Sequence, residues 1–197
     1  MNESHIITSN YERNQRLRDD EELRLYLICS SDGDSSLNFR FKLDNNARLY
    51  LKVLILAKGD SKIRLNYLVQ HCGDNTASDC QILSLLDGRS AKESSMIIEV
   101  DNDATDVVAK EREDCLLLSN DAKSRAVPRV ICYNEKVDIE HSFACGHFGD
   151  SQIEYLTARG LSKRRAKRLL LDSKIQSFID GIEDENHLEY IQRCFKQ

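Results

Sequence analysis

The sequence has one proline among 197 residues and no apolar run long enough to cross a bilayer. Residues 1–15 contain neither the basic start nor the apolar centre of a secretory signal peptide. Because 41% of the residues are hydrophobic and 31% are charged, the composition is that of an ordinary globular protein, not of a disordered or fibrous one. We therefore expect a cytoplasmic protein with one core and a small appended subdomain, and no association with a membrane.

Motifs of several common catalytic sites are absent as well. The chain has no GxxxxGKS or GxxxxGKT nucleotide loop, no GxSxG nucleophile elbow and no HExxH metalloprotease motif. These absences exclude intrinsic ATPase or hydrolase chemistry of the familiar kinds. We expect a protein that is not an enzyme.

Cysteine is present seven times, but no two cysteines form a CxxC pair and their spacing is irregular. A disulfide framework or a zinc knuckle needs cysteines paired at short fixed intervals, so the sequence argues against both. We expect most of these cysteines to be small buried side chains in a reducing compartment.

The net charge of −5 gives the whole chain no attraction to nucleic acid, so such binding would have to come from a local patch. The basic run KRRAKR, Lys163 to Arg168, could contact phosphates if it lies in a helix pair. A solvated helix face is the alternative, because an apolar stripe passes through the run and no aromatic residue is interleaved with it. We therefore expect no nucleic-acid partner.

Residues 23–133 alternate apolar and polar side chains with period two, which is typical of strands that each bury one face. Short clusters rich in Asp, Asn, Ser and Gly separate them, and we interpret these as turns. Such a pattern fits a sandwich, a barrel or a β-solenoid, and periodicity alone does not choose. Only Asp87-Gly88 offers a two-residue hairpin turn, which weakens a meander. The positions expected to face inward include Leu23, Leu25, Leu27, Cys29, Leu37, Phe39, Phe41, Leu43, Ile63, Leu65, Tyr67 and Val69.

After Gly149 the apolar period becomes helical. We expect Asp150 to cap a helix that ends at Gly160, and Ser162 to cap a second helix. The apolar stripes expected of the helical segments are Ile153 and Leu156, then Ala166, Leu169 and Leu170, and finally Leu188, Ile191 and Phe195. The sequence thus predicts three parts: residues 1–22, poorly structured or a short helix; a β core, residues 23–149; and a helical subdomain, residues 150–197.

Three stretches carry a family resemblance. HSFACGHFGDSQIEYLTARGLSKRRAKRLLL resembles the C-terminal end of the SufB and SufD core, where a histidine-centred strand runs into the pattern QLFYLxSRGLxxxEAxxLL. YLVQHCGDNTASDCQILSLLDGRS and DCLLLSNDAKSRAVPRVICYNEKVDIEHS resemble two stretches upstream of it in that family. Together they cover roughly residues 60–171, and their order and spacing make the resemblance specific.

The resemblance implies a right-handed parallel β-helix, that is a β-solenoid, followed by helices, and a role in iron-sulfur cluster assembly. It implies a non-catalytic scaffold or partner subunit that pairs with a SufB-type paralogue or with itself and docks the SufC-type ATPase. The cofactor it implies is a transient iron-sulfur cluster, with none tightly bound. The given sequence departs from the family by starting without its long N-terminal helical region.

The same resemblance indicates which residues could bind the metal. His141 matches the family histidine at the interface between SufB and SufD, and Glu140 matches the carboxylate before it. The essential SufB-type cysteine would fall at Glu113, so the chain looks more like SufD. Cys115 lies two residues further on and, with period two, on the same face, so it could substitute. A structural histidine, a solvated glutamate and a buried core thiol are the respective alternatives.

Other candidates are weaker. Cys145 and His147 could add ligands, and His71-Cys72 fits a buried strand pair better. The residues expected to anchor the ATPase are Tyr155, Leu156, Arg159, Leu169 and Leu170, because apolar side chains and Arg dominate interface energetics. Packing against the β core is the alternative for Leu156 and Leu169. The competing function is a β-rich protein-interaction module without metal.

Overall fold

A computed structural model of the chain describes residues 1–31, 33–179, 189 and 190. Within these residues, eleven strands are followed by two helices. The elements are β1 (Asn2–Ile7), β2 (Tyr11–Leu17), β3 (Glu22–Ser31), β4 (Ser35–Leu43), β5 (Arg48–Ala57), β6 (Lys62–His71), β7 (Ala77–Leu86), β8 (Ala91–Val100), β9 (Val107–Leu117), β10 (Lys123–Ile131), β11 (Val137–Gly146), α1 (Asp150–Ala158) and α2 (Lys163–Ile179).

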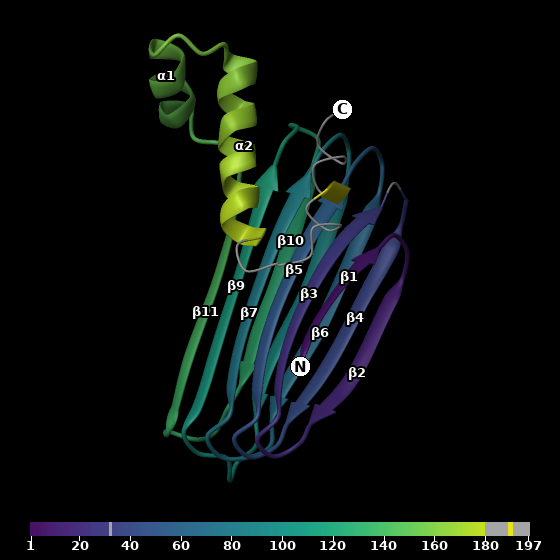
Figure 1. The fold of residues 1–197 in the computed structure, drawn as a ribbon, viewed down its shortest axis with the longest axis vertical. Helices are drawn as coiled ribbons and strands as arrows, with labels where there is room; N and C mark the ends of the chain where they lie inside the picture. Colours follow the sequence, from purple (N-terminus) through teal and green to yellow (C-terminus); the bar gives the residue numbers. More distant parts are fainter. Residues whose placement is uncertain (32, 180–188, 191–197) are drawn as a thin grey trace.

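The strands form two parallel sheets, one from the odd-numbered and one from the even-numbered strands (Figure 1). The first has the order β1-β3-β5-β7-β9-β11 and the second β10-β8-β6-β4-β2. The chain therefore passes from one sheet to the other with every strand and climbs by one strand spacing per coil. The expected β-solenoid is confirmed, with about five coils. Asp87-Gly88 joins β7 to β8 in different sheets, so it is a corner of a coil and not a hairpin.

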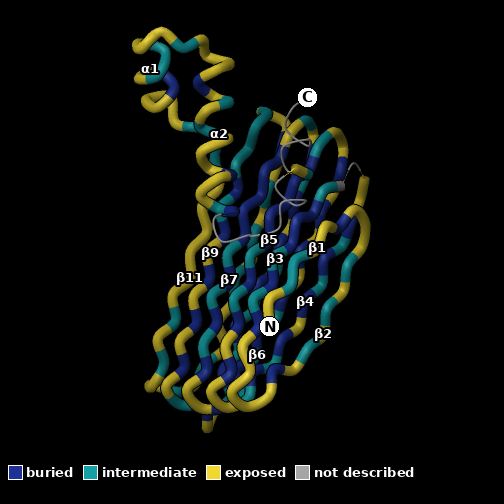
Figure 2. The backbone as a smooth tube through the Cα atoms, in the orientation of Figure 1, coloured by how far each residue is buried: buried dark blue, intermediate teal, exposed yellow. Residues whose placement is uncertain are grey.

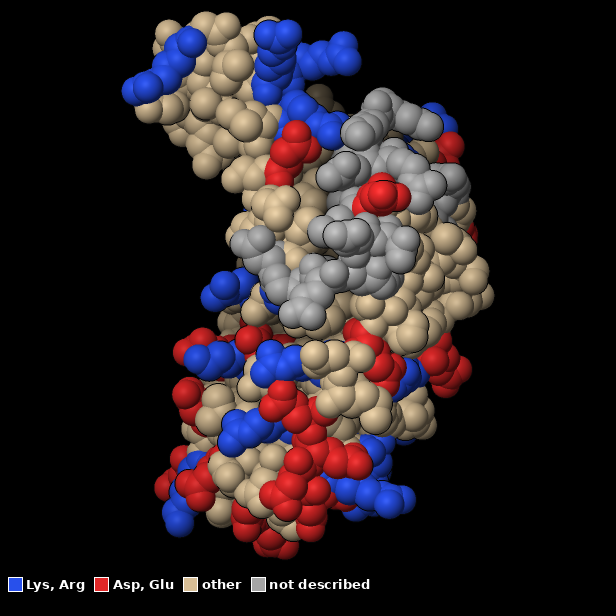
Figure 3. Space-filling model, viewed as in Figure 1, with Lys and Arg blue, Asp and Glu red and all other residues tan. Residues whose placement is uncertain are grey.

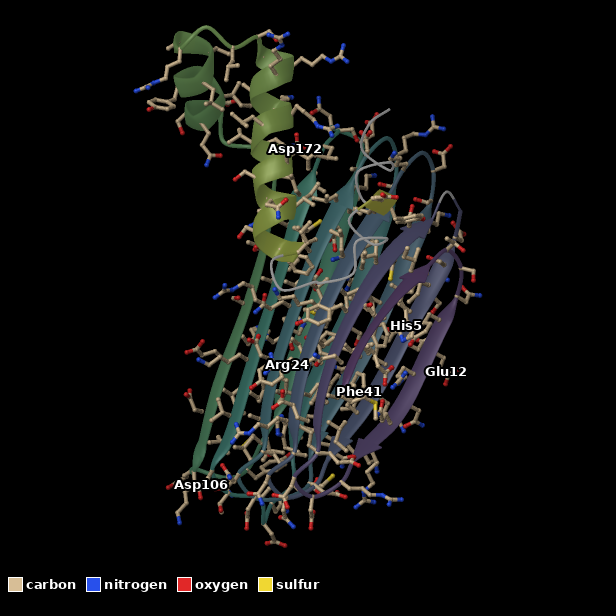
Figure 4. The ribbon with its side chains drawn as sticks, in the orientation of Figure 1. His5, Glu12, Arg24, Phe41, Asp106 and Asp172 are labelled. Carbon is tan, nitrogen blue, oxygen red and sulfur yellow. The ribbon has the colours of Figure 1, made fainter. Side chains whose placement is uncertain are left out.

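The core fills the space between the two sheets because one residue in two points into it. On β4 the inward side chains are Leu37, Phe39, Phe41 and Leu43, and all four are buried. Figure 2 shows the resulting alternation of buried and exposed positions along the strands, and Figure 4 places Phe41 within the body of the solenoid. The inward positions expected from the sequence belong to this single core.

The corners at one end of the solenoid stack on one another. Asp20, Asn46, Asn75 and Asp106 occupy equivalent corners, and each has a positive φ, between 54° and 63°. Asn and Asp tolerate this left-handed conformation better than most residues. The Asn46 side-chain nitrogen donates to Asp20 Oδ1 (2.9 Å) and that of Asn75 to Asn46 Oδ1 (2.9 Å). Figure 4 places Asp106 at the end of the solenoid far from the helices.

The N-terminal residues correct one expectation. Residues 1–22 were expected to be poorly structured or a short helix, but β1 and β2 form the first coil, paired in parallel with β3 and β4. Periodicity missed them because their inward positions are largely polar, with Arg13 and Gln15 on β2.

The helices follow the solenoid, and α2 packs on the outer face of the odd-numbered sheet. Its buried residues Leu171, Ile175 and Ile179 contact Leu54 and Leu83 among others. Lys52 Nζ donates to the Phe178 carbonyl (3.1 Å), and Lys174 Nζ lies 2.7 Å from Asp114 Oδ2. The C-terminal half of α2 thus fixes its position on the sheet.

Two expectations about these helices are corrected. Leu169 is 51% exposed and Leu170 is half-buried, because the face of α2 that meets the sheet is offset from the expected stripe; Ala166 is buried as expected. The N-cap of α1 is Gly149, with no side-chain cap, whereas Ser162 Oγ accepts from the Arg165 amide as expected (3.3 Å). Leu188, Ile191 and Phe195 lie outside the described residues.

A search of the described residues for a membrane-crossing helix finds none with the required length and hydropathy.

Candidate functional site

The last coil of the solenoid is open at the end formed by β10 and β11. These strands are the edges of their sheets, so each presents one side without a neighbouring strand in the described chain. Val130 and Phe143 face inward, in register with the buried Ile98 and Glu113, yet they are 45% and 38% exposed. Among the residues that the structure describes, no further coil covers them. The open end therefore combines unpaired backbone with exposed apolar side chains.

The interior changes from apolar to charged beneath this end. Lys92 on β8 and Glu113 on β9 are fully buried and form an ion pair between the two sheets. Lys92 Nζ also donates to Ser84 Oγ (2.9 Å), and Ser94 Oγ donates to Glu113 Oε2 (3.0 Å). Burial lowers the pKa of Lys92 to about 8, because it removes water from the ammonium group. The nearby Cys115 and Cys145 side chains oppose this lowering of the Lys92 pKa.

Glu111 is a second buried carboxylate, one inward position before Glu113 along β9. Neither of its oxygens has a hydrogen-bond partner among the residues described. His141 lies beside it on β11, with Nδ1 3.7 Å from Oε1. Burial raises the pKa of Glu111, while the nearby Tyr67 hydroxyl and His141 ring oppose that shift. The predicted ligand His141 thus sits at the open end, backed by a buried carboxylate.

Cys115 and Cys145 are direct neighbours on β9 and β11. Cys115 is buried, and burial raises the pKa of its thiol to about 11, although the Lys92 ammonium opposes this. Such a thiol is protonated near neutral pH, which suits a core side chain better than a ligand. His141 is four residues from Cys145 along β11, about 13 Å in an extended strand. One metal ion cannot join His141 to Cys115 within this chain.

Glu140 points away from the interior, as period two requires. Its carboxylate is exposed and lies 3.9 Å from Lys110 Nζ. The structure therefore does not gather Glu140, His141 and Cys115 into one site. His147 follows β11, and its Nδ1 donates to the Leu117 carbonyl (2.8 Å).

His71 is buried, with its two ring nitrogens at hydrogen-bond distance from Thr76 Oγ1 (2.8 Å) and Ser78 Oγ (3.0 Å). Cys72 beside it is half-buried. The expectation of a buried strand residue is therefore confirmed for His71, because both ring nitrogens have hydrogen-bond partners inside the core.

The helix pair presents a separate surface. Tyr155 on α1 and Leu169 on α2 are 57% and 51% exposed. The Arg159 guanidinium lies 4.6 Å from the centre of the Tyr155 ring, and Leu156 and Leu170 are half-buried. Three of the five anchors predicted for a partner, Tyr155, Arg159 and Leu169, are therefore accessible.

Within the described part of the chain, His, Cys, Asp and Glu side chains form no group of three or more that could hold a metal ion. The described residues therefore do not gather His141 with other thiolate, imidazole or carboxylate groups of the kinds that iron accepts. A complete ligand set at the open end would need groups other than these described residues.

Sequence reasoning missed Lys92 and Glu111. A signal for each was present, because period two places Lys92 with Ser94 and Met96 on the inward face of β8, and Glu111 with Glu113 on that of β9. A charged residue at an inward position is costly to bury unless another group pairs with it. Sequence alone does not say which residue across the solenoid supplies it.

Comparisons with known proteins identify the family of this chain. Residues 2–174 match the family described as SUF system FeS cluster assembly, SufBD core domain. Iron-sulfur cluster assembly SufBD family proteins of Mycobacterium tuberculosis and Mycobacterium bovis are each 28% identical over 146 residues, which is 73% of this chain and 35% of the relative. One from Staphylococcus aureus is 27% identical over 77 residues, covering 39% of this chain and 16% of the relative.

The chain spans about a third of the length of the mycobacterial relatives. The family match nevertheless covers most of this chain, both sheets of the solenoid and the start of the helical part. The chain therefore belongs to the SufBD core domain family of iron-sulfur cluster assembly proteins.

Proposed function

We propose that this chain is a non-catalytic subunit of an iron-sulfur cluster assembly complex, with a role closer to that of SufD than of SufB. It pairs through the open end of the solenoid with a SufB-type protein, or with a second copy of itself. His141 then lies at the seam, as one ligand of a transient cluster. The helix pair docks a SufC-type ATPase.

The observation that carries this proposal is the open end formed by β10 and β11. Unpaired edge strands are templates for strand addition, and proteins that stay monomeric usually block them. Here β10 has nine residues and β11 has ten, and Val130 and Phe143 are exposed beside them. Pairing with a like subunit would extend both sheets and cover these side chains.

The assignment closer to SufD rests on Glu113. At the position where the resemblance puts the essential SufB-type cysteine, this chain has a buried carboxylate paired with Lys92. A carboxylate enclosed in this way offers no soft ligand to iron. The thiolate ligands of the cluster would therefore come from the partner, and the imidazole of His141 from this chain.

Docking of an ATPase is supported by the accessible side chains of the helix pair. Tyr155, Arg159 and Leu169 combine an aromatic ring, a guanidinium and an aliphatic side chain, which are the kinds of group that dominate interface energetics. Because α2 is anchored on the sheet by Leu171 and Ile175, a push on the helices would be transmitted to the solenoid.

The test is anaerobic co-purification with a SufB-type protein and a SufC-type ATPase, comparing wild type with His141→Ala and with His5→Ala as a matched control. His5 lies on β1 at the opposite edge of the same sheet. Iron and labile sulfide are quantified in each complex. We expect wild type, His141→Ala and His5→Ala each to form the complex. Only His141→Ala should lower the amount of iron and labile sulfide in it.

Two outcomes would contradict the proposal in different ways. Failure of wild type to form any complex would argue that assembly is not the function. A stable complex with equal cluster content in all three samples would favour an interaction module in which His141 binds no metal.

A further inference from the structure

A groove of about 750 Å³ lies between the start of α2 and the end of the solenoid. Four basic side chains line it, namely Lys163, Arg164, Lys167 and Arg168. Arg168 pairs with Asp172 at 2.9 Å, whereas Lys163, Arg164 and Lys167 form no ion pair with a described residue. Figure 3 shows Lys and Arg side chains gathered over the helical end, while Asp and Glu are concentrated toward the opposite end of the solenoid.

The position of these cations is unfavourable for the helix itself. Five of the first six residues of α2 are basic, and its first turn has no acidic residue. A helix N-terminus carries a positive partial charge, so cations there repel it and one another. A sequence that breaks a local rule without a gain in stability commonly does so for function. A bound anion would supply the missing negative charge.

The rest of the groove combines an apolar wall with polar side chains, among them Asn120. Its wall is formed by Leu117, Leu118, Phe148, Ile153 and Leu171. His147 also lines it, and its Nδ1 donates to the Leu117 carbonyl (2.8 Å). Two carboxylates, Asp87 and Asp150, lie at the groove as well. The site therefore suits a molecule that has an anionic part and an apolar part.

We propose that this groove binds an organic phosphate, with its phosphate groups held by Lys163, Arg164 and Lys167 and its apolar body against the wall that includes Phe148. Lys and Arg make strong charge-assisted hydrogen bonds to phosphate, and the volume lies within the usual range of small-molecule sites. A nucleic-acid strand fits less well, because the chain has a net charge of −5 and no aromatic residue is interleaved with the basic run.

The groove lies on the same helix pair as the proposed ATPase anchors, but it shares none of those five residues. Neither Tyr155 nor Leu169 lines the groove, and the open end formed by β10 and β11 is not part of it. Binding of an organic phosphate in this groove does not depend on a role in cluster assembly, and it can be tested on the chain alone.

The experiment uses the full chain, with ADP as the probe and calorimetric titration at one fixed ionic strength. Inorganic pyrophosphate and adenosine are titrated separately, to distinguish the phosphate groups from the apolar body. Arg164→Gln and Arg165→Gln form a matched pair, because they are adjacent on α2 and remove the same charge, but only Arg164 lines the groove. Circular dichroism checks that both variants fold.

We expect ADP to bind wild type, pyrophosphate to compete with it and adenosine to bind far more weakly. Arg164→Gln should weaken ADP binding about tenfold, and Arg165→Gln less than about twofold. Absence of both ADP and pyrophosphate binding at millimolar concentration would overturn the proposal, as would equal losses in the two variants. An oligonucleotide that binds more tightly than ADP would replace it with a nucleic-acid interface.

Discussion

His141 and Glu111 face each other across two neighbouring parallel strands, with the imidazole Nδ1 3.7 Å from the carboxylate Oε1. Glu111 is buried, whereas His141 is accessible at the open end. This distance is too long for a hydrogen bond, so the carboxylate and the ring interact through charge alone. The pair thus places a buried carboxylate beside an accessible imidazole.

Replacing Glu111 by leucine should stabilise the fold. Its two carboxylate oxygens have no hydrogen-bond partner in the described chain, and an unsatisfied buried group costs about 1–3 kcal/mol. We expect Glu111→Leu to raise the free energy of unfolding by that order, measured by urea denaturation at pH 7. Glu93→Leu, on an exposed position of β8, is the control and should change it by less than about 0.5 kcal/mol. A less stable Glu111→Leu protein would mean that the carboxylate has a favourable partner.

Removing either partner of the Lys92 and Glu113 ion pair should lower the free energy of unfolding, whereas removing both should change it little. Lys92→Met or Glu113→Leu alone leaves a charge buried without its counterion, which typically costs about 3–5 kcal/mol. The double variant removes both charges, so we expect its unfolding free energy to return close to that of wild type. A double-mutant cycle by urea denaturation measures the coupling. Additive losses would show that the two groups do not stabilise each other.

The coil repeat was predictable because its signals are local. Period two along β4 identifies the face that carries Leu37 and Phe41, and the Asp and Asn clusters mark the corners where Asn46 and Asn75 adopt positive φ. What periodicity could not choose was whether neighbouring strands pair in antiparallel hairpins or in parallel coils. That choice depends on contacts between residues about 30 positions apart, and here the family resemblance supplied it.

The site was predicted only in part for the same reason. His141 was identified by its resemblance to a family residue, but its neighbour Glu111 is 30 positions away in sequence and becomes adjacent only through the register of β9 and β11. Lys92 is likewise brought to Glu113 by the closure of the two sheets. Leu169 was expected to be part of an apolar stripe, yet the offset of α2 on the sheet leaves it exposed.

Stability should fall on mild acidification because of His71. Burial lowers the pKa of this histidine from 6.5 to about 4, so the folded state keeps the ring neutral while the unfolded chain takes up a proton. Stability is therefore fully present above pH 6.5 and is lost as the pH falls toward 4, by about 3 kcal/mol for this group. We expect His71→Gln to lose less stability than wild type between pH 7 and pH 4.5 in urea denaturation. Equal losses would assign the effect to carboxylates elsewhere.

Close stacking of the corners should make Gly73 hard to replace. A Cβ at this position would overlap the backbone nitrogen of Asn45 in the coil below. Because backbone cannot move aside as a flexible side chain can, we expect Gly73→Ala to lower the free energy of unfolding by about 1–3 kcal/mol. Gly33→Ala is the matched control, since a Cβ there has no atom within 4 Å. Similar thermal unfolding curves for the two variants would contradict the tight stacking.

Pairing through the open end should depend on Phe143. This side chain faces inward at the last coil and is 38% exposed, so a partner would bury it, and an aromatic residue buried in an interface commonly contributes about 2 kcal/mol or more. We expect Phe143→Asp to weaken association with the SufB-type protein at least about thirtyfold, measured by light scattering over a dilution series. Val108→Asp is a matched control, because Val108 is 37% exposed but lies on β9, away from the edge. If Phe143→Asp associates as tightly as wild type while Val108→Asp does not, the partner contacts the outer face of the sheet and the open end is not the interface.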